Sequence, residues 1–205
     1  MKRPVSTQVR GRQTGVTLIE ILVAVLLLSF ALLGIAGLLS TTTRYQLGVE
    51  ARSSVTYLFN DLTARIRANF DTATVSAAHY LYSDNWAAQQ SATLTAPSPS
   101  CAASGGSNCS MNELAAFDLW EMRSAARRQM PQGALQISGD AAQGMVATYM
   151  WFDKDNTDTD AVGAATLKSA PTCVATMNAI EQQSCCPAAA AAPAGVRCLN
   201  LRFVP

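Results

Sequence analysis

Three features of this 205-residue sequence bear most directly on chemistry. They are an acid beside a long apolar run, six cysteines, and a cluster of aspartates. Glu20 immediately precedes residues 21–43, which carry no charge and read ILVAVLLLSFALLGIAGLLSTTT. A carboxylate in hydrocarbon is energetically costly, so an acid kept at such a position is expected to have a functional partner. The sequence therefore marks Glu20 as a candidate functional residue.

The cysteines favour disulfides over a metal site. All six lie beyond residue 100, and the chain has a single histidine, His79. Structural zinc sites combine closely spaced pairs of Cys and His, whereas cysteines in an oxidising compartment form disulfides. We expect Cys101 and Cys109 to close a small ring and Cys198 to bond to one of the three cysteines before it. The other pairings stay open among the candidates Cys101, Cys109, Cys173, Cys185, Cys186 and Cys198.

The aspartate cluster has two interpretations. Asp153, Asp155, Asp158 and Asp160 offer the hard oxygen ligands that Ca²⁺ prefers. The cluster lacks the central glycine and distant glutamate of an EF-hand loop, and Asp and Asn are also common in exposed turns for local reasons. It is a calcium candidate, with an ordinary polar turn as the alternative. No other metal and no cofactor is expected, and His79 is not expected to be catalytic.

Composition and charge argue against several classes of function. The net charge is +1, so the chain lacks the basic excess that marks nucleic-acid binding, and no nucleic-acid contact is expected. It has neither a G-x-S-x-G motif nor a glycine-rich phosphate loop, which argues against an enzyme. Lys2, Arg3, Arg10 and Arg12 precede the first acid and predict a cytoplasmic N-terminus by the positive-inside rule. The remainder would lie outside the cytoplasm, where cysteines oxidise.

The element that positions Glu20 is a long helix. A membrane-spanning helix needs about 20 apolar residues, which residues 21–43 supply, whereas a cleaved secretory signal has a shorter apolar core. No proline occurs between Pro4 and Pro97, so the helix is expected to run from about residue 17 to about residue 70. The apolar stripe of its amphipathic second half consists of Val55, Leu58, Phe59, Leu62, Ile66 and Phe70.

The rest of the sequence predicts an α+β domain. A second helix begins at the capping box of Ser110 and Glu113 and ends before Pro131. Strands are predicted at residues 134–138, 145–152 and 199–203. The predicted fold is a long N-terminal helix packed on a small antiparallel sheet, with loops held by disulfides. The apolar face of the second helix is expected to consist of Leu114, Phe117, Trp120 and Ala125.

The N-terminal motif resembles that of a known family. Residues 15–20, GVTLIE, follow a short basic leader and precede the apolar helix, and in this context they resemble the class III signal of type IV prepilins. In that family a membrane peptidase cleaves after the glycine, and the new N-terminal residue is N-methylated. The resemblance implies cleavage between Gly15 and Val16, N-methylation of Val16, and pairing of Glu20 with the N-terminal amine of a neighbouring subunit. Val16 departs from the commonest residue at that position, phenylalanine.

A second resemblance covers residues 109–133, CSMNELAAFDLWEMRSAARRQMPQG. This stretch is similar to the Cys–helix–Pro-Gly segment of PilV-type minor pilins. The matching residues are Glu113, Leu114, Ala115, Asp118, Leu119 and Trp120. The sequence thus resembles a type IV pilin-like protein, and within that class a PilV-type minor pilin.

The resemblance implies four segments along the chain. They are a basic leader at residues 1–15, a transmembrane and filament-core half-helix at 16–43, an amphipathic half-helix at 44–72, and a globular pilin domain at 73–205. It implies a single-pass inner-membrane protein with its N-terminus in the cytoplasm and its globular domain in the periplasm, which then enters a pilus on the cell surface.

The implied function is structural and non-enzymatic. A minor pilin takes part in the assembly or priming of a type IV pilus, which serves motility and adhesion. The implied partners are the major pilin, other minor pilins, the prepilin peptidase and the inner-membrane assembly platform. The alternatives are a pseudopilin of a type II secretion system and, in a different class, a membrane-anchored periplasmic enzyme.

Overall fold

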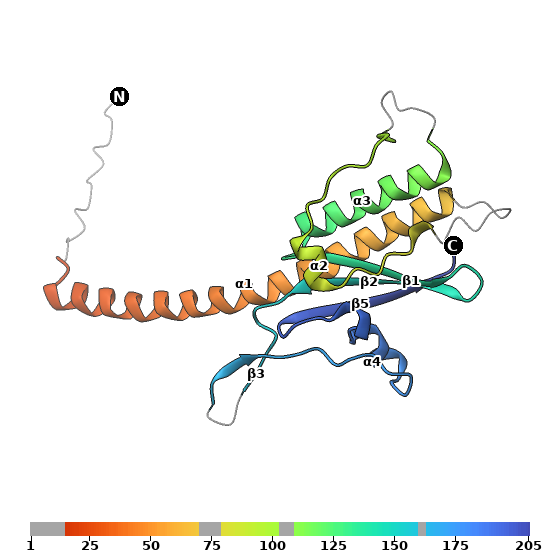
Figure 1. Cartoon of the computed structure of the whole chain (residues 1–205). Coiled ribbons are helices and arrows are strands. Elements are labelled where there is room, and N and C mark those ends of the chain that lie inside the picture. The colour runs from red at the N-terminus through yellow and green to blue at the C-terminus, as the bar shows by residue number, and fades with distance from the viewer. Residues whose placement is uncertain (1–14, 70–78, 103–108, 160–162) are drawn as a thin grey trace, which may run out of the picture. The chain divides into compact units, whose positions relative to one another are not determined.

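A computed structural model of the chain describes residues 15–69, 79–102, 109–159 and 163–205 (Figure 1). It divides into two compact units, Met1–Tyr45 and Gln46–Pro205. Helix α1, Leu18–Ala68, has residues in both units and agrees with the expected helix, since no proline interrupts it.

The first unit contains the apolar part of α1. Hydroxyl side chains in this part bond to carbonyls one turn earlier: Ser29 Oγ donates to Val25 O at 2.7 Å, and Thr43 Oγ1 donates to Leu39 O at 2.8 Å. These bonds satisfy hydroxyls that would be costly to place in hydrocarbon unpaired. Within the described chain, α1 is the one helix long and apolar enough to cross a membrane, judged by length and composition, and its most apolar stretch is not buried.

In the second unit α1 is amphipathic. Its buried stripe, at three- and four-residue steps, consists of Ala51, Val55, Leu58, Leu62 and Ile66. These side chains pack in one cluster with residues of the sheet and of helix α3, Met111–Gln129. Phe59, expected in the same stripe, is partly buried, with its ring centre 5.8 Å from that of Phe203. Phe70, the last residue of the expected stripe, lies outside the described residues.

The sheet has three antiparallel strands in the order β1-β2-β5. They are β1 Ala134–Asp140, β2 Gly144–Phe152 and β5 Val196–Phe203, and each includes a predicted strand and is longer than predicted. The α+β fold class, with a long N-terminal helix packed on a small antiparallel sheet, is confirmed. A separate hairpin of β3 Thr157–Thr159 and β4 Ala165–Leu167 lies between β2 and β5 in the chain.

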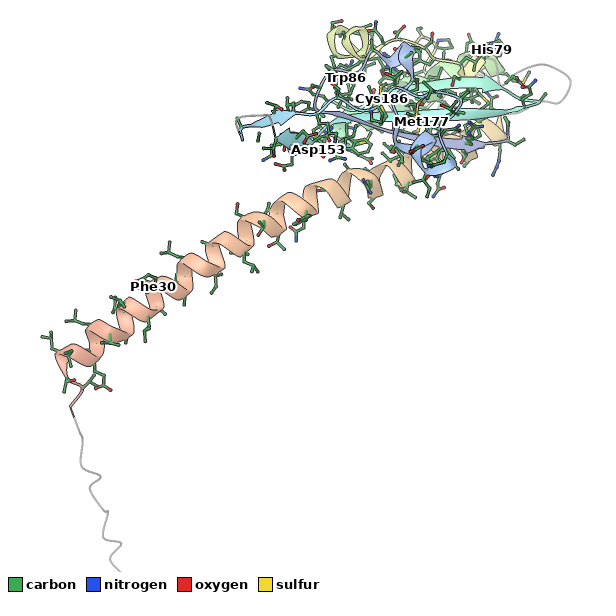
Figure 2. The ribbon with its side chains drawn as sticks, turned by 90° about the horizontal axis from the view of Figure 1, so that it is seen from below. Phe30, His79, Trp86, Asp153, Met177 and Cys186 are labelled. Carbon is green, nitrogen blue, oxygen red and sulfur yellow. A yellow bond between two sulfur atoms is a disulfide. The ribbon has the colours of Figure 1, made fainter. Side chains whose placement is uncertain are left out.

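Both faces of the sheet are covered, although the sequence predicted a helical layer on one face only. One face contributes Leu135 and Tyr149 to the cluster formed with α1 and α3. The other face packs against Trp86, the first residue of helix α2 Trp86–Ser91, and against Cys186 (Figure 2). The two-sided burial explains why β2 is apolar nearly throughout rather than alternating.

Helix α3, Met111–Gln129, begins at the predicted capping box. Ser110 N donates to the Glu113 carboxylate at 2.8 Å, and Ser110 Oγ accepts from Glu113 N at 3.4 Å. The predicted apolar face is wrong in its large side chains, because Leu114, Phe117 and Trp120 are only partly buried. Small side chains allow α3 to pack closely, so its buried residues are Ala115, Asp118, Met122, Ser124, Ala125 and Ala126.

Three disulfides hold loops of the second unit. They join Cys101 to Cys109, Cys173 to Cys185, and Cys186 to Cys198. The adjacent cysteines 185 and 186 have different partners, so the segment that contains helix α4, Ala179–Ser184, is closed into a ring and also tied to β5. This segment has few large apolar side chains, and covalent links compensate for its small contribution to the core.

Candidate processing and assembly site

The segment before α1 contains the bond that the sequence marks for processing. Gly15, Val16 and Thr17 are exposed and non-helical. The Thr17 carbonyl accepts the first helical hydrogen bonds, from Glu20 N at 3.1 Å and from Ile21 N at 3.3 Å. Within the described chain, no atom beyond its chain neighbours lies within 4 Å of where a Cβ on Gly15 would stand. The Gly15–Val16 bond therefore precedes the hydrogen-bonded helix and has an accessible backbone.

Glu20 lies in the first turn of α1. An acid at this position interacts favourably with the partial positive charge of the helix N-terminus. Its side chain is exposed, and none of the described residues supplies a hydrogen-bond donor or a cation to the carboxylate. In an apolar environment, a partner for Glu20 has to come from another molecule or from another part of the chain.

The apolar part of α1 presents large side chains on all sides, as those around Phe30 show (Figure 2). Between Leu18 and Leu39 these side chains are 52% to 77% exposed. A helix that is apolar all round and uncovered by its own chain belongs in a membrane or in the interior of an assembly.

Two of the expected calcium ligands, Asp153 and Asp158, are engaged in other contacts. Asp153 Oδ2 accepts from Arg197 Nε at 2.5 Å, and its Oδ1 accepts from the backbone N–H of Asp155 at 3.0 Å. Asp158 forms an exposed ion pair with Lys168 at 3.3 Å. The Asp153 and Asp158 carboxylates thus take part in a turn hydrogen bond and two ion pairs. The side chain of Asp155 is exposed.

Asp160 lies outside the described residues, so the four-acid calcium set remains a prediction. His79 is exposed. Across the parts of the chain that the structure describes, no three His, Cys, Asp or Glu side chains gather as a metal ion would require.

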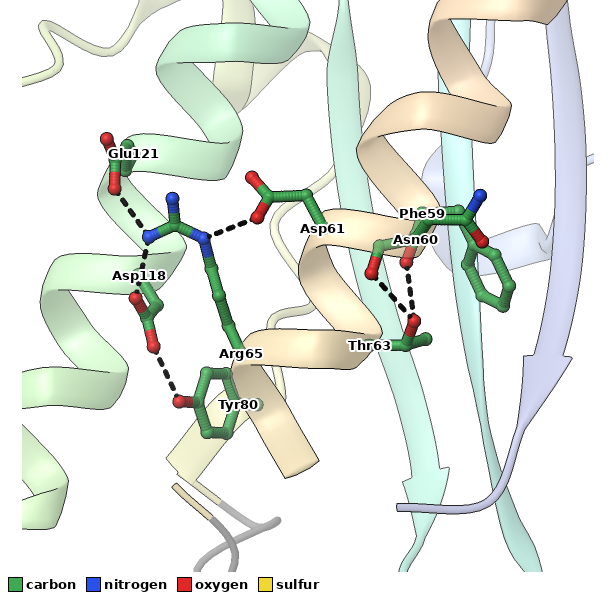
Figure 3. A network of polar contacts seen from close by, with 8 residues as sticks. All are labelled: Phe59, Asn60, Asp61, Thr63, Arg65, Tyr80, Asp118 and Glu121. Atoms are coloured by element: carbon green, nitrogen blue, oxygen red, sulfur yellow. Dashed lines mark hydrogen bonds and ion pairs between the residues drawn. The ribbon is translucent and has the colours of Figure 1, made fainter. Parts of the chain in front are cut away.

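A polar network that the sequence did not predict joins α1 to α3 (Figure 3). Arg65 donates to Asp61 at 3.0 Å, to Asp118 at 2.9 Å and to Glu121 at 2.5 Å. Asp118 also accepts from the Tyr80 hydroxyl at 2.7 Å, and Tyr80 is fully buried. Both carboxylate oxygens of Asp118 are paired, one with Arg65 and one with Tyr80, so the network fixes the packing of these elements.

One signal for this network was present in the sequence. Asp118 lies on the same helical face as Ala115 and Met122, an unusual position for an acid unless it has a buried partner. That partner, Arg65, is 53 residues away in the chain, so local pattern alone does not identify it.

The network and the nearby core alter the protonation of several side chains. Burial, aided by the hydrogen bond to Asp118, raises the pKa of Tyr80 well above its ordinary value. Burial is also the main cause that raises the pKa of Tyr149. For Arg65, burial opposes the charge, but hydrogen bonds to three carboxylates outweigh it and raise the pKa, so the guanidinium stays charged.

Comparison with known proteins identifies the N-terminal region. Residues 10–36 match the prokaryotic N-terminal methylation motif, which includes Gly15, Val16 and Glu20. The match supports a type IV pilin-like or pseudopilin-type protein with a prepilin-type signal, and together with the apolar helix it indicates anchoring in a membrane. No curated protein and no solved structure matches the chain.

Replacing Asp118 by alanine is expected to destabilise the second unit by about 2–4 kcal/mol, because the change leaves the buried Tyr80 hydroxyl without its acceptor and removes one of the carboxylates of Arg65. Urea unfolding of the full chain in detergent, followed by tryptophan fluorescence, measures the loss. Asp158→Ala breaks an exposed ion pair and is the matched control, with no measurable change expected. Equal effects of the two substitutions would contradict a structural role for the network.

The free energy of unfolding is expected to fall as the pH rises above about 10. Tyr80 and Tyr149 keep their protons in the folded state, whereas the unfolded chain loses them near the ordinary pKa of 10.0. The unfolded state therefore binds fewer protons than the folded state at this pH, and stability declines. Urea unfolding across this range tests the expectation.

Tyr149→Phe provides the control for this pH dependence. The Tyr149 hydroxyl is buried without a hydrogen-bond partner among the described residues, so its removal costs no such bond. The variant is expected to match the parent near neutral pH and to lose less stability at high pH. An unchanged slope in the variant would show that Tyr149 does not contribute.

Proposed function

We propose that this chain is a minor pilin of a type IV pilus, with a structural and non-enzymatic role in pilus assembly or priming. The observation that carries the proposal is the N-terminal methylation motif at residues 10–36, which overlaps an apolar helix that its own chain leaves uncovered. Such a helix is suited first to a bilayer and then to a filament core. Motility and adhesion are the processes that the pilus would serve.

Processing by a prepilin peptidase is the first step of this proposal. Cleavage between Gly15 and Val16 removes the basic leader, and Val16 becomes the N-methylated first residue of the mature chain. The exposed, non-helical backbone at residues 15–17 supports this step, because a peptidase needs access to a bond that is not held in a helix.

Glu20 is proposed to neutralise the Val16 ammonium of an adjacent subunit. Coulomb attraction increases as the dielectric constant falls, so the pair is stronger in a water-poor filament core than in water. The absence of a partner for Glu20 among the described residues of its own chain supports a partner in another subunit. One acid and one amine in each subunit would also align neighbouring helices.

The proposed location is the inner membrane, followed by the pilus. The basic leader favours a cytoplasmic N-terminus, and three disulfides suit a globular unit in the oxidising periplasm. The proposed partners are the prepilin peptidase, the inner-membrane assembly platform, the major pilin and other minor pilins.

Within the pilin-like proteins we favour a PilV-type minor pilin over a type II secretion pseudopilin. The methylation motif is compatible with both. The ring closed by Cys101 and Cys109 leads directly into the capping box of α3, an arrangement similar to that of PilV-type minor pilins. This similarity supports the pilus assignment.

Deletion of the gene is expected to reduce surface pili and to leave enzyme secretion intact, because a minor pilin serves pilus assembly. Counting pili by electron microscopy and assaying secreted enzymes in the same strains measures both outcomes. Complementation with the full chain is the control. Normal pili with impaired secretion would assign the chain to the secretion system instead.

Mass spectrometry of the mature protein is expected to show a chain that begins at N-methylated Val16. The reason is that the accessible Gly15–Val16 bond lies at the cleavage point implied by the motif. Gly15→Val is expected to leave the leader attached, since the added side chain hinders a peptidase that recognises glycine. A native N-terminus at any other residue would contradict the proposed processing.

Glu20→Ala is expected to leave the protein in the membrane and to remove it from sheared filaments, because the apolar helix is intact and the proposed partner of the N-terminal amine is lost. Immunoblots of membranes and of filaments separate the two effects. Glu50→Ala, which removes another exposed acid of α1, is the control and is expected to enter filaments. Normal incorporation of the Glu20 variant would rule out the proposed pairing.

A further inference from the structure

A cavity of about 560 Å³ lies between the sheet and the disulfide-bonded segment 173–187, and we call it the α4 pocket. Its residues come from β1, β2 and β5 on one side and from α4 and its flanking residues on the other. The volume falls within the range of about 300–1,000 Å³ that is typical of small-ligand sites.

The register of the strands explains why the cavity lies there. Gln136, Thr148 and Asn200 are cross-strand neighbours and form a buried polar row on this face. Asn200 Nδ2 donates to Gln182 O at 2.7 Å and to Cys185 O at 2.8 Å, which holds the covering segment on the sheet. Thr148 and Asn200 of this row line the pocket.

The next row of residues on the same face of the sheet lines the cavity. It consists of Ser138, Val146 and Arg202, which are cross-strand neighbours and line the pocket. Arg202 Nη2 donates to Gln182 Oε1 at 3.2 Å, and this bond orients the guanidinium. No carboxylate in the described part of the chain pairs with Arg202, and it is the charged residue of the described lining.

Aliphatic side chains lie in the lining of the pocket and next to it. Val174 lines the pocket and is 51% exposed, and Ile180, next to the lining residue Ala179, is 79% exposed. Val146, in the same row as Arg202, adds a further apolar contact. Exposed aliphatic side chains around a cavity that holds a cation and polar groups are typical of a binding site.

We propose that the α4 pocket binds a monocarboxylate with an aliphatic body, as presented by the C-terminal residue of a polypeptide or by a small organic acid. The free donors of Arg202 bind the carboxylate, and the aliphatic body packs on Val146 and Val174. The Gln183 side chain, which makes no hydrogen bond within the described chain, is available to an amide of the ligand. The site is independent of the N-terminal motif, so the inference does not depend on the proposed pilus function.

The test is an NMR titration of the isotope-labelled full chain in detergent with N-acetyl-leucine. Saturable shifts are expected at the residues of the α4 pocket. N-acetyl-leucinamide, which lacks the carboxylate, is expected to bind at least about tenfold more weakly, since a charge-assisted hydrogen bond contributes at least that much. A ligand that affects only the apolar part of α1, or an amide that binds as tightly as the acid, would overturn the proposal.

Two test variants and one control variant connect the binding to the pocket. Arg202→Gln is expected to weaken binding of N-acetyl-leucine about tenfold or more, whereas Arg52→Gln makes the same charge change at an exposed position outside the pocket and is expected to have no effect. Ala175→Trp fills the pocket from an exposed position and is expected to abolish binding. Equal affinities of both arginine variants and the parent would overturn the proposal.

A third probe separates the two sources of the ligand. 4-Methylpentanoate has the carboxylate and aliphatic body of N-acetyl-leucine without its amide. Tighter binding of N-acetyl-leucine supports the end of a polypeptide, and equal binding supports a small organic acid. Both results support the carboxylate pocket, and failure of both acids to bind rejects it.

Discussion

The constraint on which the rest of this protein depends is an apolar helical surface that its own chain does not cover. From Leu18 to Leu39 the large side chains of α1 remain more than half exposed. Removal of apolar surface from water is the dominant favourable term in folding and association, so this surface requires an apolar surrounding. A bilayer and a filament core both provide one, and on the proposed function the same surface serves in each in turn.

Two acids in helices show how the surroundings separate structural from functional charges. Asp118 is buried on α3, where Arg65 and the Tyr80 hydroxyl satisfy its two oxygens. Glu20 lies at the start of an apolar helix, and the described chain provides it with no partner. Asp118 therefore stabilises the fold of its own chain. Glu20 has no cationic partner within the described chain, and we propose that another subunit supplies one.

The second face of the sheet is held by a different balance of forces from the first. On the first face, large apolar side chains of α1 and the strands form a conventional core. On the second, the covering segment is poor in such side chains, and two disulfides together with the hydrogen bonds of Gln136 and Asn200 keep it in place. The covering segment is hydrogen-bonded to the sheet at Asn200. The next row of the sheet, Ser138, Val146 and Arg202, lines the α4 pocket.

The sequence by itself determined the features that depend on neighbours in the chain. The basic leader with Gly15 and Glu20, the uninterrupted helix, the capping box at Ser110 and the three main strands all follow from local spacing and periodicity. Only the tertiary structure decided which residues of α3 are buried, what covers the second face of the sheet, and how Cys185 and Cys186 are paired. These features depend on contacts between segments far apart in the chain, and the partner of an acid such as Asp118 cannot be read from the residues beside it.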